Sequence, residues 1–282
     1  MTGPPQLVLH LGLHKTGTSS AQHLFWRNKG SLAPHVSLGL LRHLKPAVSL
    51  AAAYSRSRNP LLLLDLSEAL SDLLAEAPAD RHLLVSCEGL SGHLPGWPGV
   101  DDYGAAADLA QVVAGTLAER FPDHALSLVY TLRAAEPWLW SAWRHHLIGQ
   151  RLTQSFEDFA NQHRAAADLP AVARAVAEAV APARVQTLTL EETQAHPLGP
   201  GGALLAGLGL PDSLMAELHP VKPGNRGPEA ALADRLLALN RSDLPDDEVR
   251  ARKAMLCDAA GVGGWARGPR AGRRKTSLEG GR

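Results

Sequence analysis

A short apolar segment that leads into a glycine-bearing loop and then into a helix restricts the fold more than any other feature. Gln6–Leu13 has the length and composition of a buried strand, and Ser19–Asn28 has apolar residues at helical spacing. The loop Gly12–Ser20 joins the two. A strand, a tight turn and a helix form the first half of a βαβ unit, so we expect a parallel sheet covered by helices.

The same alternation continues along the chain. Further strands are predicted at His82–Ser86, Ala125–Leu132 and Arg184–Leu190. Helices are predicted at Pro60–Ala77, Asp102–Arg120, Glu136–Gln150, Phe156–Ala167, Ala171–Ala181, around Leu204 and at Pro228–Asn240. We therefore predict an α/β fold with a central parallel sheet flanked by helices and a site at the carboxyl ends of the strands. Residues 1–260 are expected to form one domain, and the Gly/Arg-rich tail 261–282 is expected to be disordered.

Charge and cysteine content exclude several functional classes. The formal net charge is zero, and residues 261–282 hold six basic residues and one acidic residue, so the body has no basic excess that would favour nucleic acid. Cys87 and Cys257 are the two cysteines and form no CxxC motif, which favours a reducing compartment. Because the sequence shows no signal peptide and no long apolar stretch, we expect a cytoplasmic protein without stable membrane insertion.

The loop Gly12–Ser20 has the residues of an anion-binding site. Glycines at positions 12 and 17 allow close approach of the backbone, and the start of the next helix offers N–H groups and the positive end of its dipole. Lys15 adds a mobile positive charge. Hydroxyl groups come from Thr16, Thr18, Ser19 and Ser20. The alternative is an ordinary helix N-cap beside a solvated lysine.

The order of these residues differs from that of a nucleoside-triphosphatase loop. Such a loop has Lys directly after its second glycine, followed by a Ser or Thr for magnesium. Here Thr18 follows Gly17, and Lys15 lies two places before that glycine. The sequence also has no HExxH motif and no Cys/His cluster, so no metal is expected. A GxSxG motif is absent as well, which counts against an α/β hydrolase.

The segment His14-Lys-Thr-Gly-Thr-Ser-Ser20 resembles the 5′-phosphosulfate loop of the sulfotransferase family, and most closely its bacterial carbohydrate-type branch. The resemblance implies a P-loop NTPase-like three-layer architecture. It also implies that 3′-phosphoadenosine 5′-phosphosulfate (PAPS) is the co-substrate and that Lys15, Thr16, Gly17, Thr18, Ser19 and Ser20 bind it.

A second motif of the same family lies more than a hundred residues further on. In that family a strand ends in Arg, and a Ser eight positions later in the next helix joins it on the 3′-phosphate. Arg133 and Ser141 have this spacing, so the resemblance assigns both to the donor. A weaker likeness at Pro223–Ala230 makes Asn225 and Arg226 possible donor contacts. The resemblance covers about residues 6–240 in outline.

Three residues are candidates for the chemistry. Lys15 is placed to follow the charge on the departing phosphate. Glu88, at the end of a predicted strand, is the favoured general base, and a salt-bridged or capping Glu is the alternative reading. His14 is the competing base, because an imidazole titrates near neutral pH.

The sequence thus predicts a sulfotransferase that acts on a hydroxyl or amine of a carbohydrate or small-molecule acceptor, without a metal. A P-loop small-molecule kinase or nucleotide hydrolase is the second hypothesis. A non-catalytic nucleotide-binding protein is the third.

Overall fold

The computed structural model describes residues 3–221 and 227–262. Asn225 and Arg226 and nearly all of the predicted tail, residues 263–282, lie outside the described residues. The chain divides into two compact units. Unit 1 takes in Met1–Trp143 and Gln154–Asn225, and unit 2 takes in Arg144–Thr153 and Arg226–Arg282. Residues 1–260 were expected to form one domain, and whether the two units act as one stays a prediction.

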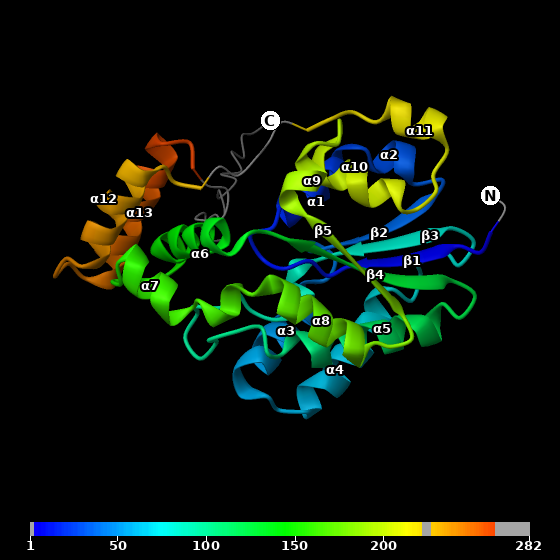
Figure 1. The fold of residues 1–282 in the computed structure, drawn as a ribbon, viewed down its shortest axis with the longest axis horizontal. Helices are drawn as coiled ribbons and strands as arrows, with labels where there is room; N and C mark the ends of the chain where they lie inside the picture. Colours follow the sequence, from blue (N-terminus) through cyan, green and yellow to red (C-terminus); the bar gives the residue numbers. More distant parts are fainter. Residues whose placement is uncertain (1–2, 222–226, 263–282) are drawn as a thin grey trace, which may run out of the picture. The chain divides into compact units, whose positions relative to one another are not determined.

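Unit 1 is built on a sheet of five parallel strands. They are β1 (Gln6–His10), β2 (Val36–Leu40), β3 (His82–Ser86), β4 (Ala125–Leu132) and β5 (Arg184–Thr189). Their order in the sheet is β2-β3-β1-β4-β5, and every pairing is parallel (Figure 1). The predicted α/β class with a central parallel sheet is confirmed. Because β1 is the middle strand, the loop after it lies at the centre of the carboxyl edge.

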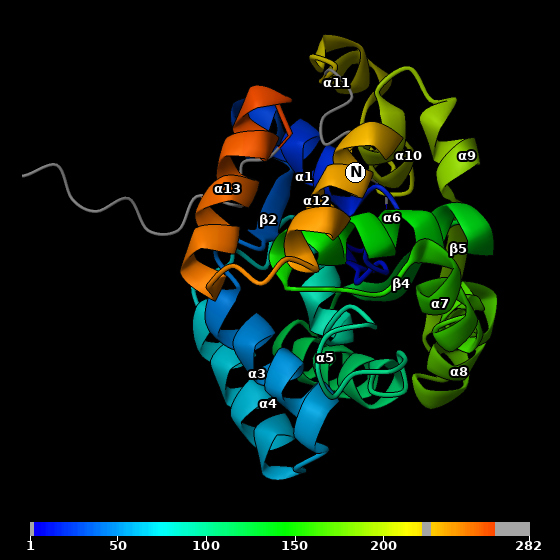
Figure 2. The same cartoon turned by 90° about the vertical axis from the view of Figure 1, so that its left-hand side faces the viewer.

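Helices cover both faces of this sheet, as Figures 1 and 2 show. One face carries α1 (Thr18–Arg27), α2 (Lys29–Leu32), α9 (Leu190–Gln194), α10 (Gly199–Ala206) and α11 (Asp212–Glu217). The other carries α3 (Lys45–Ser57), α4 (Leu61–Leu73), α5 (Ala106–Arg120) and α8 (Leu169–Ala179). The helix α7 (Phe156–Gln162) precedes α8, and 3₁₀ turns lie at Glu88–Ser91 and Ala165–Ala167. This is the predicted three-layer arrangement.

The core on the α1 face explains why these segments fold together. Ala21, Leu24 and Phe25 lie on one side of α1 and are fully buried, against Val8 of the central strand and Leu204 of α10. Burying a side chain of this size contributes about 1.5–3 kcal/mol. The strongly apolar strands between two helical layers are typical of a parallel sheet.

The strand β2 and the helix α3 were not predicted from the sequence. Val36-Ser-Leu-Gly-Leu40 is short and contains Ser and Gly, which are poor strand formers. Its pairing with β3 supplies what the local sequence lacks, with Gly39 opposite Val85. The first strand was expected to extend to Leu13, but β1 ends at His10, and Leu11 and Leu13 are buried in the loop that follows.

Unit 2 contains two helices, α12 (Ala230–Asn240) and α13 (Asp246–Ala259), and the chain segment Arg144–Thr153. The helix α6 (Ala135–Gly149) begins in unit 1 and ends in unit 2. Helix α13 was not predicted from the sequence, because half of its residues are charged and its apolar face is narrow. Val249, Lys253 and Cys257 are its buried positions, at the four-residue spacing of one helix face.

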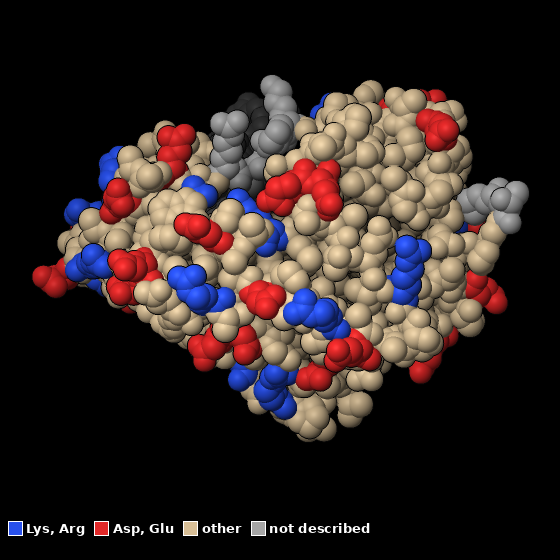
Figure 3. Space-filling model, in the orientation of Figure 1, with Lys and Arg blue, Asp and Glu red and all other residues tan. Residues whose placement is uncertain are grey.

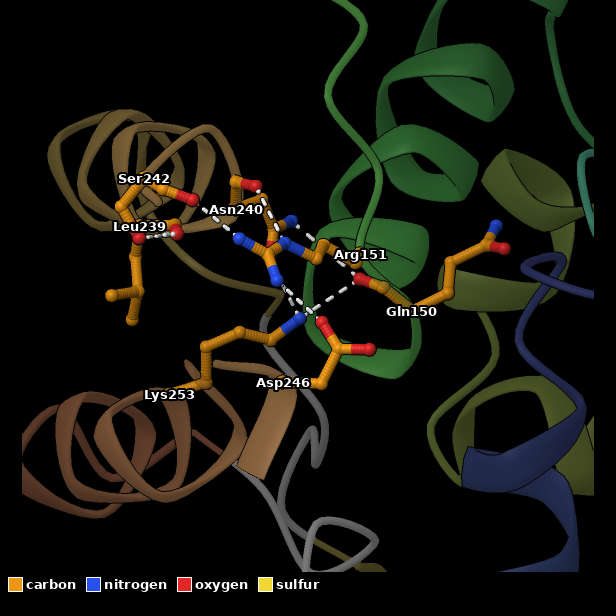
Figure 4. A network of polar contacts seen from close by, with 7 residues as sticks. All are labelled: Gln150, Arg151, Leu239, Asn240, Ser242, Asp246 and Lys253. Atoms are coloured by element: carbon orange, nitrogen blue, oxygen red, sulfur yellow. Dashed lines mark hydrogen bonds and ion pairs between the residues drawn. The ribbon is translucent and has the colours of Figure 1, made fainter. Parts of the chain in front are cut away.

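Asn240 is the centre of a polar network that holds unit 2 together (Figure 4). Its Nδ2 donates to the carbonyl oxygens of Leu147 and Leu152, at 3.1 and 2.9 Å. Its Oδ1 accepts a hydrogen bond from Lys253 Nζ at 2.9 Å, and that ammonium also donates to the Gln150 carbonyl at 2.8 Å. Arg151 is hydrogen-bonded to the Asn240 carbonyl and paired with Asp246. Burial lowers the pKa of Lys253 to about 8.

The helices, the surface charges and the cysteines bear on where the protein resides. No helix among the described residues is long and apolar enough to cross a bilayer. Figure 3 shows Lys and Arg interspersed with Asp and Glu over the face in view. Cys87 and Cys257 are both buried and free. The cytoplasmic location expected from the sequence stays a prediction.

We expect the substitution Asn240→Ala to destabilise unit 2 by about 3 kcal/mol, because it removes the donor to the carbonyls of Leu147 and Leu152 and takes one of two acceptors from the buried Lys253 ammonium. Chemical denaturation followed by circular dichroism measures this change. Asn161→Ala is the control: that side chain is exposed and its loss should cost less than about 0.5 kcal/mol. Equal effects of the two substitutions would contradict the central role of Asn240.

Candidate functional site

Three neighbouring strands end at one edge of the sheet and bring the candidate residues there. His10 is the last residue of β1 and pairs in register with Ser86, the last residue of β3. Arg133 directly follows β4. Because carboxyl ends of parallel strands share an edge, the loop 11–17, Glu88 and Arg133 emerge side by side.

The loop after β1 has an unusual backbone. Gly12, Lys15 and Gly17 all have positive φ, at 22°, 69° and 98°. A Cβ on Gly17 would lie 2.7 Å from Leu190 Cδ1, and one on Gly12 would lie 2.9 Å from both His10 Nε2 and Thr18 Oγ1. Such contacts exclude any larger residue at either glycine without a shift of its neighbours. The φ of Lys15, a residue with a side chain, marks a strained position of the kind found at functional sites.

Gly17 is also the N-cap of α1. Its carbonyl accepts hydrogen bonds from the N–H groups of Ser20 and Ala21, at 3.0 and 3.2 Å. Having no side chain, it cannot cap the N–H groups of the first turn in the way that Ser or Asp would. The positive end of the α1 dipole therefore faces the loop without an intramolecular cap.

A chain of hydrogen bonds joins this loop to the sheet. Thr16 Oγ1 donates to the Leu13 carbonyl at 2.5 Å and lies 2.7 Å from Thr131 Oγ1. Thr131 Oγ1 lies 3.3 Å from His10 Nε2, and His10 Nδ1 lies 2.8 Å from Ser86 Oγ. All four side chains of the chain, on Thr16, Thr131, His10 and Ser86, are fully buried. They fix the loop to β1, β3 and β4 together.

His10 has no charge in this setting. Burial lowers its pKa to about 4, so its imidazole is neutral at physiological pH. His10 was not among the residues predicted for the site. One signal for it is present in the sequence, because a histidine at the end of an otherwise apolar strand must find polar partners when buried.

A second set of contacts holds the loop from the outside. The backbone N–H of His14 donates to Tyr103 Oη at 3.1 Å, and Trp138 Nε1 donates to the His14 carbonyl at 2.9 Å. The His14 ring is stacked on Tyr103 at 6.1 Å between centroids. Tyr103 and Trp138 are both buried. Trp138 of α6 and Tyr103 thus support the loop, and neither was predicted from the sequence as a site residue.

Arg133 contacts the loop through its guanidinium. Its Nη1 donates to the Lys15 carbonyl at 3.3 Å. The side chain is half-buried, and burial lowers its pKa, while the negative charge of Glu191 raises it in part. Ser141 lies in α6 with the predicted spacing and is half-buried. No hydrogen bond joins the side chains of Arg133 and Ser141 within the described part of the chain.

Glu88 lies on the β3 side of the loop. Gln22 of α1 donates to Glu88 Oε2 at 2.9 Å and, from the same Nε2, to the Ser86 carbonyl at 3.1 Å. Burial raises the pKa of the Glu88 carboxyl. Hydrogen bonds from its own backbone N–H and from Gln22, together with the charge of Lys15, counteract part of that rise. The structure therefore brings Lys15, Glu88 and Arg133 together, and Gln22 is a further partner that the sequence did not reveal.

Two buried polar atoms at this edge suit an anionic ligand. Thr18 Oγ1 and Arg133 Nε are buried and have no hydrogen-bond partner among residues 3–221 and 227–262. A hydroxyl and a guanidinium N–H can both donate to a phosphate or sulfate oxygen. A buried donor without an acceptor costs about 1–3 kcal/mol, which a bound oxyanion would recover. The two donors thus suit the anionic groups of the nucleotide that the sequence resemblance implies, Thr18 its 5′-phosphosulfate and Arg133 its 3′-phosphate.

In the same described residues, no group of three or more His, Cys, Asp or Glu side chains is arranged to hold a metal ion.

The chain was compared with protein families, curated proteins and solved structures. No protein-family model matches the chain, and no curated protein matches it. Among solved structures, the chain is similar to a sulfotransferase from Alicyclobacillus acidocaldarius, with 15% sequence identity and a TM-score of 0.46. The match covers 93% of this chain and 98% of the other. A likeness this distant carries no inference about family or activity.

We expect Gly17→Ala to lower the free energy of unfolding by about 2 kcal/mol or more, because it imposes both an unfavourable φ and a contact with Leu190. Thermal and chemical denaturation measure the change. Gly30→Ala is the matched control, since a Cβ there meets nothing within 4 Å and the residue is helical. That variant should be as stable as the wild type or more stable. A stable Gly17→Ala protein would show that the loop is less constrained than its geometry indicates.

Proposed function

We propose that the protein transfers a sulfuryl group from PAPS to a hydroxyl or amine of a carbohydrate or small-molecule acceptor. The observation that carries this proposal is the loop 12–20 facing Arg133, with buried donors on Thr18 and Arg133 that have no acceptor among the described residues. The loop lacks the lysine after Gly17 that a triphosphatase requires, and no cluster of carboxylates for magnesium lies among the described residues.

The residues of the loop would hold the 5′-phosphosulfate. The first-turn N–H groups of α1, the hydroxyl of Thr18 and the ammonium of Lys15 are its proposed contacts. Ser19 and Ser20 are half-buried in the first turn and are proposed to add hydroxyl donors. Thr16 has a different place, because its hydroxyl is already bonded to Leu13 and Thr131, so its proposed role is to position the backbone. Arg133, with Ser141, is proposed to contact the 3′-phosphate.

In the proposed reaction an acceptor oxygen or nitrogen forms a bond to sulfur as the bond from sulfur to the 5′-phosphate oxygen breaks. Glu88 takes the proton that the acceptor loses. Lys15 balances the negative charge that grows on the phosphate oxygen, since its own charge already acts on Glu88 at this edge. His14 is held against Tyr103 by stacking and hydrogen bonds, which makes Glu88 the preferred base.

A small-molecule kinase or nucleotide hydrolase is the second candidate, and a non-catalytic nucleotide-binding protein the third. The same loop would serve all three, so donor choice and turnover decide between them.

The first test is binding of 3′-phosphoadenosine 5′-phosphate, measured by isothermal titration calorimetry without magnesium and compared with ATP plus magnesium. We expect binding of the former and a loss of about 100-fold in affinity for Arg133→Ala, because a charge-assisted contact to phosphate is worth about 1.5–3 kcal/mol. Arg184→Ala, an exposed arginine on the strand next to β4, is the control and should bind as the wild type does. Binding of ATP alone would favour the kinase reading.

The second test is the pH dependence of sulfuryl transfer from PAPS to a panel of saccharides. A base must be deprotonated, so the rate should rise with pH through the pKa of Glu88, which burial places above the ordinary value of 4.5. Glu88→Gln should lower kcat by about 100- to 10,000-fold, abolish this acid limb and leave donor binding intact. The His14→Gln variant should still show the rise of the rate with pH. If the rise of the rate with pH disappears in His14→Gln and stays in Glu88→Gln, His14 is the general base and Glu88 is not.

A further inference from the structure

The N-terminal part of the chain carries positive charge without any acidic residue. The first Asp or Glu of the sequence is Asp65, whereas residues 1–64 contain seven Lys and Arg. Four of these seven come from two short segments, at the α1–α2 junction and after β2. They are Arg27, Lys29, Arg42 and Lys45, and all four are exposed.

An exposed tryptophan joins the two segments. Trp26, near the end of α1, has 38% of its surface exposed. Lys29 Nζ lies 3.8 Å from the centre of its ring, and Arg42 Cζ lies at the same distance. A cation over an indole ring gains about 0.5–1 kcal/mol at an exposed site. The ring therefore contacts two cations from different segments, and these contacts offset part of the repulsion between the two charges.

No carboxylate neutralises these two cations. Neither Lys29 nor Arg42 forms an ion pair with an Asp or Glu of residues 3–221 and 227–262. The neighbouring His43 shows the effect of the field: its pKa is lowered, first by burial and then by the charge of Arg42. Leu41, 39% exposed, adds an apolar patch beside them. We call Trp26, Lys29, Leu41 and Arg42 the cationic platform.

The platform lies close to the proposed general base. Helix α1 starts at the donor loop. Its residue Gln22 is hydrogen-bonded to Glu88, and Trp26 follows Gln22 by four residues. Residues four apart lie on the same face of a helix, with their Cβ atoms about 6 Å apart. Along α1 the order is therefore the donor loop, Gln22 with its contact to the base, and the platform residue Trp26. An acceptor with its reacting hydroxyl at Glu88 would extend toward the platform.

We propose that the cationic platform binds the acidic substituents of an anionic saccharide acceptor while one of its hydroxyls lies at Glu88. This inference rests on the proposed function, and it narrows the acceptor class from carbohydrates in general to those carrying carboxylate or sulfate groups. A guanidinium makes paired hydrogen bonds to a carboxylate or a sulfate, and an ammonium adds a second point charge. The exposed edge of Trp26 and Leu41 offers apolar contact to the non-polar side of a sugar ring.

The charge pattern favours this occupant over a lipid surface. Stable attachment to an anionic membrane requires a polybasic segment together with a substantial apolar insertion or a lipid chain. The platform exposes one indole edge and one leucine, and both cations are fixed over the ring instead of extending outward. Trp26 also lies one helical turn from Gln22, which contacts Glu88, and this places the platform within reach of an acceptor.

The experiment measures binding of polygalacturonate, an unsulfated chain of carboxylated sugars, by isothermal titration calorimetry at low and at physiological salt. Neutral dextran of matched length is the reference ligand. The wild type should bind polygalacturonate and not dextran, with affinity falling as salt rises. The double substitution Lys29→Gln/Arg42→Gln should weaken binding about tenfold or more, because it removes two exposed charge contacts. Arg164→Gln/Arg184→Gln, which removes two exposed arginines elsewhere in unit 1, should bind as the wild type does.

Each variant is also titrated with 3′-phosphoadenosine 5′-phosphate, which keeps this inference separate from the proposed function. If the wild type binds that nucleotide and the platform variant loses only polygalacturonate, the inference is supported. If the wild type binds the nucleotide but no anionic saccharide, or if both double variants lose the saccharide equally, the inference fails while the proposed function stands. If the nucleotide does not bind, the proposed function fails by itself. Binding to phosphatidylglycerol vesicles in place of the saccharide would overturn the saccharide assignment.

Discussion

The hydrogen-bonded chain from Ser86 through His10 and Thr131 to Thr16 is the interaction on which the site depends. A loop that is buried at the edge of a sheet has polar backbone and hydroxyl groups that must find partners away from water. Here a neutral imidazole, whose pKa burial lowers to about 4, links hydroxyls of two neighbouring strands with the loop. This link supports the positive φ of Lys15 from the inside of the loop, while Arg133, Tyr103 and Trp138 hold the backbone of Lys15 and His14.

This network satisfies the polar groups in the interior of the loop and leaves two buried donors at the same edge unused. Thr16 is bonded within the protein, whereas Thr18 Oγ1 and Arg133 Nε lack partners among the described residues. The same loop therefore has a structural side and a ligand side. Positive charge from Lys15 and the dipole of α1 lies on the ligand side, next to a carboxyl whose pKa burial has raised. A site of this kind combines anion binding with proton transfer.

The parts of this arrangement that could be predicted are those formed by residues close together in the sequence. The glycines, Lys15 and the hydroxyls of the loop are adjacent in sequence, so strand, loop and helix followed from one segment. The groups that support the loop come from distant segments. Tyr103 and Trp138 lie about 90 and 120 residues away along the chain, and their contacts follow from tertiary packing alone. The same reason explains β2, whose Ser and Gly are poor strand formers and which exists through its pairing with β3.

Electrostatics connects the donor site to the surface beyond it. A chain whose first 64 residues have seven cations and no Asp or Glu must place those charges where something offsets their repulsion. The structure does so in two ways. Lys15 lies within the field of Glu88, and Lys29 and Arg42 lie over the ring of Trp26. The first pairing brings a cation to the proposed reacting centre, and the second leaves two cations without a carboxylate partner in the described chain. Gln22, which contacts Glu88, and Trp26, which contacts the two cations, are one turn apart on α1. This helix therefore sets the spacing between the proposed base and the cationic platform, and a bound acceptor would have to match that spacing.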